Sequence, residues 1–192
     1  MNIAIVGATG NVGIKTLEIL EKKELSIDNL YLIASPKSAG KKISFKGKDH
    51  EVFNLESFDF SKVKIAFFAA GGKISEKFAE KASKHCLVID NSSFYRMDPD
   101  VPLIVPQVNS NHLDGIKKNI IANPNCSTAQ LVIVLKPLHD LFSIKRVVVS
   151  TYQSVSGGGK APMDELIEQT KLVLEGKKVK SKNFTKQIAF NA

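Results

Sequence analysis

The stretch Asn2-Ile-Ala-Ile-Val-Gly-Ala-Thr-Gly-Asn-Val-Gly13 decides how the chain begins to fold. Its first half is a continuous apolar run, which is typical of a strand that is buried on both faces. In its second half, Gly7 permits a tight turn, Gly10 lets the backbone approach a pyrophosphate, and Gly13 allows a helix to pack closely on the sheet. The pattern G-x-x-G-x-x-G between a strand and a helix therefore predicts a dinucleotide site, with an ordinary glycine turn as the alternative.

The remaining chain alternates between predicted strands and helices. We expect helices at 11–22, 74–84, 127–141 and 161–175, and the first helix should turn Val12, Leu17, Ile19 and Leu20 inward. Strands are expected at 2–6, 29–34, 64–70, 87–90, 103–105, 120–122 and 145–152, with a strand pair or an edge element at 43–55. This alternation predicts an α/β fold with a doubly wound parallel sheet.

Composition excludes several classes of protein. The sequence has no run of about 18 apolar residues, so no membrane span is predicted. The N-terminus lacks the pattern of a signal peptide, and the two cysteines, Cys86 and Cys126, make no disulfide framework, which favours a reducing cytoplasm. The net charge of +8 comes from scattered lysines without interleaved aromatics, so we interpret it as a solvated surface rather than a nucleic-acid site. No metal site is predicted.

The end of the second predicted strand indicates which dinucleotide binds. A site for NAD usually has an acidic residue here, whereas this chain has Ser35, Lys37 and Ser38. Hydroxyl groups and a cation suit a 2′-phosphate, so we predict NADP(H), with a polar surface loop as the alternative. The candidate cofactor-binding residues are Gly7, Thr9, Gly10, Asn11, Val12, Ser35, Lys37, Ser38, Gly72, Ser156 and Gly157.

The motif Asn123-Pro-Asn-Cys-Ser-Thr128 carries the predicted chemistry. It precedes an apolar helical pattern, so Cys126 should lie at a helix N-terminus, where the helix dipole and free amides favour a thiolate. Cys86 enters an apolar strand and is interpreted as an inert core residue. A reactive thiol together with a nicotinamide cofactor predicts an acyl group held as a thioester while a hydride is transferred.

Other polar residues follow predicted strands at the same edge of the sheet. Gln153 begins a glycine-rich loop and could bond an acyl carbonyl, although the loop alone could simply be flexible. The chain has only two arginines, and Arg96 lies in the loop that also holds Asn91 and Ser93. A planar guanidinium suits a carboxylate or a phosphate, so these three residues are candidates for binding substrate.

These motifs resemble aspartate-semialdehyde dehydrogenase. The resemblance covers residues 1–192 and is carried by Gly-Ala-Thr-Gly-Asn-Val-Gly, Asp-Asn-Ser-Ser-Phe-Tyr-Arg-Met, Asn-Pro-Asn-Cys-Ser-Thr, Tyr-Gln-Ser-Val-Ser-Gly and Gln-Ile-Ala-Phe-Asn. It implies NADPH-dependent reductive dephosphorylation of L-aspartyl 4-phosphate to L-aspartate 4-semialdehyde and phosphate, in lysine, methionine and threonine biosynthesis. By this resemblance Cys126 is the nucleophile, Asn125 and Gln153 orient the thioester, and Arg96 binds the substrate phosphate.

The resemblance also implies a domain organisation. A Rossmann-type NADP-binding domain is expected over 1–125, and the beginning of an α+β catalytic and dimerisation domain over 126–192. Family members are longer, form homodimers or dimers of dimers, and carry a histidine acid/base in the missing portion. His139 would lie about 20 Å from Cys126 along a continuous helix, too far to replace it. We therefore expect these 192 residues alone to be a fragment that turns over little or nothing.

Alternative functions remain open from the sequence. N-acetyl-glutamyl-phosphate reductase and glyceraldehyde-phosphate dehydrogenase share the thioester plan, but they usually have Gly-Cys and Ser-Cys-Thr-Thr where this chain has Asn125-Cys126-Ser127-Thr128. A non-catalytic NADP-binding module is a second alternative. It would need neither Cys126 nor Gln153 nor Arg96.

Overall fold

The computed structural model describes residues 1–191 and divides into two compact units, Met1–Arg146 and Val147–Ala192. Each unit is described by itself. The predicted boundary between residues 125 and 126 precedes this division, since the helix that begins at Cys126 lies in the first unit. That boundary stays a prediction.

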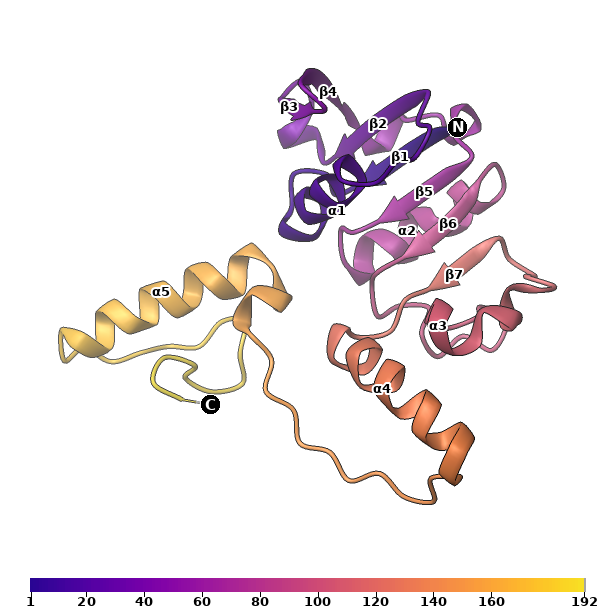
Figure 1. Ribbon diagram of the computed structural model, residues 1–192. Coiled ribbons are helices and arrows are strands. Elements are labelled where there is room, and N and C mark those ends of the chain that lie inside the picture. The colour runs from indigo at the N-terminus through magenta and orange to yellow at the C-terminus, as the bar shows by residue number, and fades with distance from the viewer. Residues whose placement is uncertain (192) are drawn as a thin grey trace. The chain divides into compact units, whose positions relative to one another are not determined.

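The first unit is built on one seven-stranded sheet with the order β3-β4-β2-β1-β5-β6-β7 (Figure 1). Every pairing is parallel except β3 with β4, which form an antiparallel hairpin through Lys46 and Gly47, both with positive φ. The strands are β1 (Asn2–Val6), β2 (Asn29–Ala34), β3 (Lys42–Phe45), β4 (Lys48–Asn54), β5 (Ile65–Phe68), β6 (Leu87–Asp90) and β7 (Ile120–Ala122). The doubly wound α/β prediction is confirmed.

The helices explain why β1 is apolar on both faces. Ile3 and Ile5 pack with α1 (Asn11–Glu21) in one buried cluster, while Ala4 and Val6 pack with α2 (Gly72–Ser83) in a second cluster. Successive side chains of a strand point to opposite faces, so each face of β1 needs its own apolar cover. The other helices are α3 (Pro106–Asn109), α4 (Cys126–Phe142) and α5 (Lys160–Leu174).

The inner face of α1 differs from the prediction in two residues. Leu17 and Leu20 are buried as expected, together with Gly13, but Val12 and Ile19 are exposed. Positions 13, 17 and 20 follow the i, i+4, i+7 spacing of one helical stripe, and residues 12 and 19 lie beside it. The helix approaches the sheet closely enough that a glycine belongs in this stripe.

Two predicted strands are wrong. Residues 103–105 make a single bridge, from Leu103 to Ala122, because the chain turns into α3 at Pro106 and Pro102 has no N–H to donate. Residues 145–152 contain no strand and are largely exposed, with Tyr152 88% accessible. Their β-branched side chains suit a strand, but a strand needs a neighbouring strand for its backbone bonds, and no described strand pairs with this segment.

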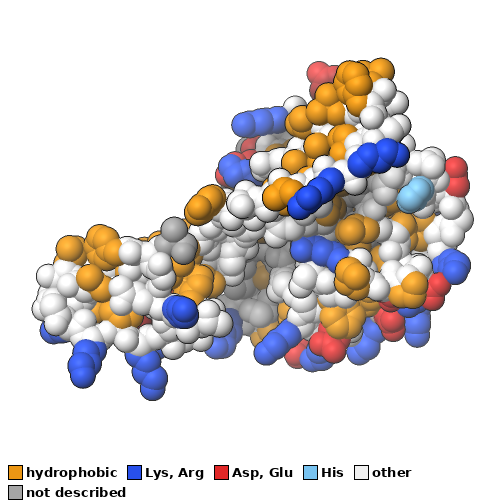
Figure 2. All heavy atoms as spheres, turned by 90° about the horizontal axis from the view of Figure 1, so that it is seen from below, with side chains coloured by type: hydrophobic (Ala, Val, Ile, Leu, Met, Phe, Trp, Pro, Cys, Tyr) orange, Lys and Arg blue, Asp and Glu red, His pale blue; other side chains and the backbone are white. Residues whose placement is uncertain are grey.

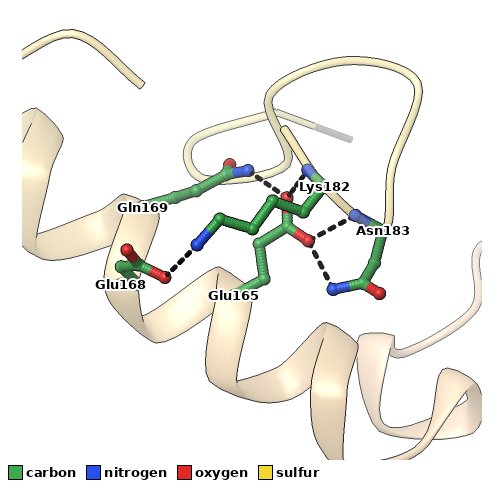
Figure 3. A network of polar contacts seen from close by, with 5 residues as sticks. All are labelled: Glu165, Glu168, Gln169, Lys182 and Asn183. Atoms are coloured by element: carbon green, nitrogen blue, oxygen red, sulfur yellow. Dashed lines mark hydrogen bonds and ion pairs between the residues drawn. The ribbon is translucent and has the colours of Figure 1, made fainter. Parts of the chain in front are cut away.

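The second unit is organised by polar groups on α5. The buried Glu165 carboxylate accepts hydrogen bonds from Gln169 Nε2, from the backbone N–H of Lys182 and from both the N–H and Nδ2 of Asn183, at 2.6–2.8 Å (Figure 3). Gln169 Oε1 accepts from the backbone N–H groups of residues 188 and 189. The tail after α5 is thereby anchored to the helix. Among the described residues, no helix is long and apolar enough to cross a membrane.

Candidate active site at the carboxyl edge of the sheet

The glycine turn between β1 and α1 has the close contacts expected of a dinucleotide cradle. Gly7 has a φ of 88° and donates its N–H to Ile33 O at 2.8 Å, and a Cβ added there would lie 2.8 Å from Ala69 O. A Cβ on Gly13 would lie 2.2 Å from Gly7 O. Both positions therefore require glycine, and the turn leaves the first amides of α1 at the surface, where a pyrophosphate would be bound.

The turn lies beside the point where the strand order reverses, because successive strands are added on one side of β1 up to β4 and on its other side from β5 onward. β1 pairs with β2 on one side and with β5 on the other, so the loops that follow β1, β2 and β5 meet at one edge. Thr9, Gly10, Asn11 and Val12 lie in the first of these loops and in the opening turn of α1. Ser35, Lys37 and Ser38 form a short 3-10 turn after β2, with the Ser35 and Lys37 side chains exposed.

Cys126 is the first residue of α4, as the sequence predicts. Asn125 is the N-cap, and its Oδ1 accepts from the N–H of Ser127 at 3.0 Å and from the Cys126 thiol at 3.5 Å. The thiol is exposed at the positive end of the helix. Cys86 is buried and donates to Ala82 O, and burial raises the pKa of its thiol to about 11. The two cysteines therefore occupy opposite environments.

Arg96 is held against the backbone of two neighbouring loops. Its Nε donates to Asn123 O at 2.9 Å, and its Nη2 donates to Asn91 O at 3.3 Å. Asn123 Nδ2 also donates to Asn91 Oδ1 at 2.5 Å. A guanidinium has five N–H donors, so three are left for an oxyanion. The structure thus brings Asn91 and Arg96 beside the loop that leads from β7 into Cys126.

Three further polar residues share this edge. A Cβ on Gly72, at the start of α2, would lie 4.0 Å from Ser93 Oγ, so these two predicted site residues are neighbours. Sequence reasoning gave no role to the buried Asp90, which ends β6, and gave Asn123 no specific contact. The signal for both was position: each directly follows or ends a strand of the same parallel sheet.

The remaining predicted residues belong to the second unit. Gln153 precedes a 3-10 turn, Val155–Gly158, that contains Ser156 and Gly157. A Cβ on Gly157 would lie 2.4 Å from Gln153 Nε2, so glycine leaves room for that amide. Because the two units are described separately, the placement of Gln153, Ser156 and Gly157 toward Cys126 or a cofactor stays a prediction.

Basic side chains form no continuous tract on the face drawn in Figure 2, where Lys and Arg lie in separate groups and several have acidic neighbours. Among the described residues, Lys117 forms an ion pair with Asp100, and Lys118 forms one with Asp98. The interpretation of the net charge as a solvated surface rather than a nucleic-acid site stays a prediction.

Two protein-family descriptions match the chain. The NAD binding domain of semialdehyde dehydrogenase matches residues 2–116, and the dimerisation domain of semialdehyde dehydrogenase matches residues 135–192. The first unit therefore carries a nicotinamide-dinucleotide-binding domain, as the glycine turn predicts.

Individual relatives agree with this assignment. The chain is 52% identical over 192 residues to an aspartate-semialdehyde dehydrogenase of Rickettsia bellii, covering 99% of this chain and 57% of the relative. A solved structure of aspartate semialdehyde dehydrogenase II from Vibrio cholerae, complexed with ASA, superposes with a TM-score of 0.91 at 49% identity and the same coverage. One from Candida albicans, solved with NADP, gives a TM-score of 0.63 at 31% identity, covering 74% of this chain and 48% of that one.

The chain thus spans little more than half the length of the relatives that it matches. Within that span, the glycine turn and Arg96 lie in the range 2–116 that matches the NAD binding domain, and Cys126 lies between the two matched ranges. The chain belongs to the semialdehyde dehydrogenase family.

Proposed function

We propose that the protein is an aspartate-semialdehyde dehydrogenase, which converts L-aspartyl 4-phosphate to L-aspartate 4-semialdehyde and phosphate with NADPH as the reductant. One observation carries the proposal. The exposed thiol of Cys126 begins α4 at the carboxyl end of β7, and the glycine turn lies at the carboxyl end of β1 in the same parallel sheet. A nucleophile and a dinucleotide cradle therefore share one edge of the fold (Figure 1).

The position of Cys126 suits nucleophilic attack on an acyl phosphate. The sulfur forms a bond to the acyl carbon, the carbon–oxygen bond to phosphate breaks, and phosphate leaves with that electron pair. When bound, the nicotinamide supplies a hydride to the carbonyl carbon of the resulting thioester. The carbon–sulfur bond then breaks, which releases the aldehyde and returns the thiolate. The positive end of α4, where Cys126 lies, would stabilise the oxygen that gains charge.

Asn125 and Gln153 are assigned to orient the acyl group. Asn125 caps α4 and bonds the thiol, so it fixes the direction in which the sulfur lies. The Gln153 amide is proposed to bond the acyl oxygen. The roles of Asn125 and Gln153 are proposed from the resemblance to the relatives, and for Asn125 also from its position next to Cys126.

Arg96 is assigned to the phosphate of the substrate, with Asn91 and Ser93 beside it. Its guanidinium is fixed through Nε and Nη2 to backbone oxygens, so its remaining donors keep one orientation. A planar fork of this kind suits a phosphate oxygen pair better than a lysine would.

NADP rather than NAD is proposed as the cofactor. The glycine cradle fits either dinucleotide, because Gly7 and Gly13 leave no room for a Cβ and open the turn to a pyrophosphate. After β2, however, the chain offers Ser35, Lys37 and Ser38 and no carboxylate for a 2′-hydroxyl. The relative from Candida albicans was solved with NADP. A homodimer is proposed as well, since residues 135–192 match a dimerisation domain.

The test is formation of NADPH from NADP, L-aspartate semialdehyde and phosphate by the purified protein. Any turnover by these 192 residues should require phosphate and disappear in Cys126→Ala, while Cys86→Ala serves as the matched cysteine control and should retain it. Turnover that survives in Cys126→Ala, or that needs no phosphate, contradicts the proposal. Cofactor binding with little or no turnover agrees with the proposal, because the histidine acid/base of the family is expected outside these 192 residues. If Cys126 is, in addition, alkylated no faster than free cysteine at neutral pH, a non-catalytic NADP-binding module is favoured instead.

A further inference from the structure

The carboxyl group of Asp90 is a fully buried polar group at the site edge. Asp90 ends β6 and has 0% of its surface exposed. Its Oδ1 accepts from Ser75 Oγ at 2.6 Å and from the N–H of Ser92 at 3.1 Å, and its Oδ2 accepts from Ser92 Oγ at 2.7 Å. A buried carboxyl group is costly unless it is bonded in this way, so its presence needs a reason.

The donors come from the two elements that flank the proposed site. Ser75 lies in the first turn of α2, three residues after Gly72. Ser92 opens the loop that leads to Arg96, and its hydroxyl also accepts from the N–H of Phe94 at 3.1 Å. Asp90 therefore links the beginning of a helix on the cofactor side to the loop on the substrate side.

The same residue is tied to Arg96 through the backbone. Asp90 O accepts from the N–H of Asn123 at 2.8 Å, and Asn123 O accepts from Arg96 Nε. The other acceptor of Arg96 is the carbonyl of Asn91, the residue that follows Asp90. Of the two residues whose carbonyl groups hold the guanidinium, Asn123 is hydrogen-bonded to Asp90, and Asn91 follows Asp90 in sequence.

We propose that Asp90 is a positioning residue, which sets Arg96 for phosphate through Ser92 and sets the start of α2 for the dinucleotide through Ser75. The inference rests on the proposed function. Asp90 touches neither ligand; it acts by holding two elements in one arrangement. Small errors in the placement of such groups have large effects on binding and rate.

The two arms of this link can be separated by substitution. Ser92→Ala removes the loop arm, Ser75→Ala removes the helix arm, and Asp90→Asn keeps the volume while replacing one acceptor oxygen with a donor. Ser83→Ala is the matched control, because Ser83 is a buried serine of the same helix whose hydroxyl donates to Glu80 O and not to Asp90. Arg96→Met measures the loss of the guanidinium itself.

Two binding measurements serve as readouts. The first is the inorganic phosphate concentration that halves the rate at which iodoacetamide alkylates Cys126. The second is the dissociation constant of NADPH, from its fluorescence. We expect Ser92→Ala to raise the protecting phosphate concentration about tenfold and to leave the dissociation constant of NADPH unchanged. Ser75→Ala should raise the dissociation constant of NADPH about tenfold and leave the protecting phosphate concentration unchanged. Asp90→Asn should raise both.

A purely structural role predicts a different result. It lowers the unfolding temperature of Asp90→Asn, Ser75→Ala and Ser92→Ala relative to Ser83→Ala without separating the two ligands, and that outcome overturns the inference. Phosphate protection that is lost in Arg96→Met but retained in Ser92→Ala and Asp90→Asn also overturns it, while leaving the role of Arg96 intact. No phosphate protection in the unsubstituted protein overturns the role of Arg96 and the inference with it. If Asp90→Asn does not fold, the two serine variants decide the matter.

Discussion

The two units of the chain are stabilised by different means. In the first unit, the buried side chains are mostly aliphatic and aromatic groups on both faces of the sheet. In the second unit, the buried residues among those described are Glu165, Gln169 and Ala189, and the first two hold the tail by hydrogen bonds. Apolar burial tolerates substitution by groups of similar size, whereas a buried carboxylate depends on each of its donors.

Asp90 and Glu165 show this difference within one residue class. Asp90 joins α2 and the loop after β6, which the apolar core already positions, so its hydrogen bonds adjust the placement of these two elements. Glu165 holds a segment that has little apolar contact of its own, so its bonds create the arrangement. The same chemical group therefore has a fine-positioning role in one unit and an anchoring role in the other.

The largest expected difference is between the reactivities of the two cysteines. Burial raises the pKa of Cys86 to about 11 and removes its sulfur from solvent, whereas Cys126 is exposed. Cys86 should react with iodoacetamide more than about a hundredfold more slowly than Cys126 near neutral pH. Peptide mass spectrometry after timed labelling checks this. Equal labelling of both cysteines in the folded protein would show that the apolar core of the first unit opens readily.

The glycine turn should be the most sensitive backbone position of the first unit. Gly13→Ala places a Cβ 2.2 Å from Gly7 O, so α1 must move from the sheet, and we expect a loss of about 3 kcal/mol in the free energy of unfolding. NADPH binding should weaken at the same time. Urea unfolding and NADPH titration measure both effects. Gly10→Ala is the control for stability alone, since its Cβ would lie 3.3 Å from the same oxygen and its effect on the free energy of unfolding should be clearly smaller.

Loss of the Glu165 carboxylate should release the tail of the second unit without unfolding the first. In Glu165→Ala, amide hydrogen exchange at Lys182 and Asn183 should rise toward that of exposed backbone, because their N–H groups lose their acceptor. Alkylation of Cys86 should not change, since that sulfur reports on the other unit. Faster labelling of Cys86 in this variant would break the distinction between the units.

Acid should have the same effect as that substitution. Burial acts to raise the pKa of Glu165, but hydrogen bonds from Lys182, Asn183 and Gln169 outweigh it and hold the pKa below its usual 4.5. The stabilisation is therefore complete above pH 4.5 and is lost as the pH falls through the lowered pKa. Exchange at Lys182, corrected for intrinsic rates, should accelerate over that range in the wild type. In Glu165→Gln it should show no such transition.

The smallest effect is expected from a neighbouring surface pair. Lys182 Nζ lies 3.4 Å from Glu168 Oε2, and both side chains are more than half exposed. Glu168→Gln should change the free energy of unfolding by less than about 0.5 kcal/mol, because exposed ion pairs contribute little. It is also the charge control for Glu165, one turn away on the same helix. A large effect of Glu168→Gln on exchange at Asn183 would mean that general charge, rather than the buried carboxylate, anchors the tail.

The sequence predicted the parts of the fold that depend on local periodicity and backbone stereochemistry. Gly7 and Gly13 predicted the turn, the motif around Cys126 with the apolar run after it predicted the start of α4, and the alternation of elements predicted the doubly wound sheet. Prediction from local sequence failed at residues 145–152. Their side chains favour a strand, but a strand forms only where another backbone supplies the bonds.

The sequence by itself determined which residues carry the proposed chemistry: a cysteine at a helix N-terminus, a glycine cradle and a scarce arginine. Only the tertiary structure decided what holds them. Arg96 meets Asn123 across 27 positions of sequence, and Ser75 meets Asp90 across 15. Lys182 meets Glu165 across 17. No local pattern encodes these contacts, because each depends on which strand ends lie side by side or on where the chain folds back, and hydrogen bonds act only over the last few ångströms.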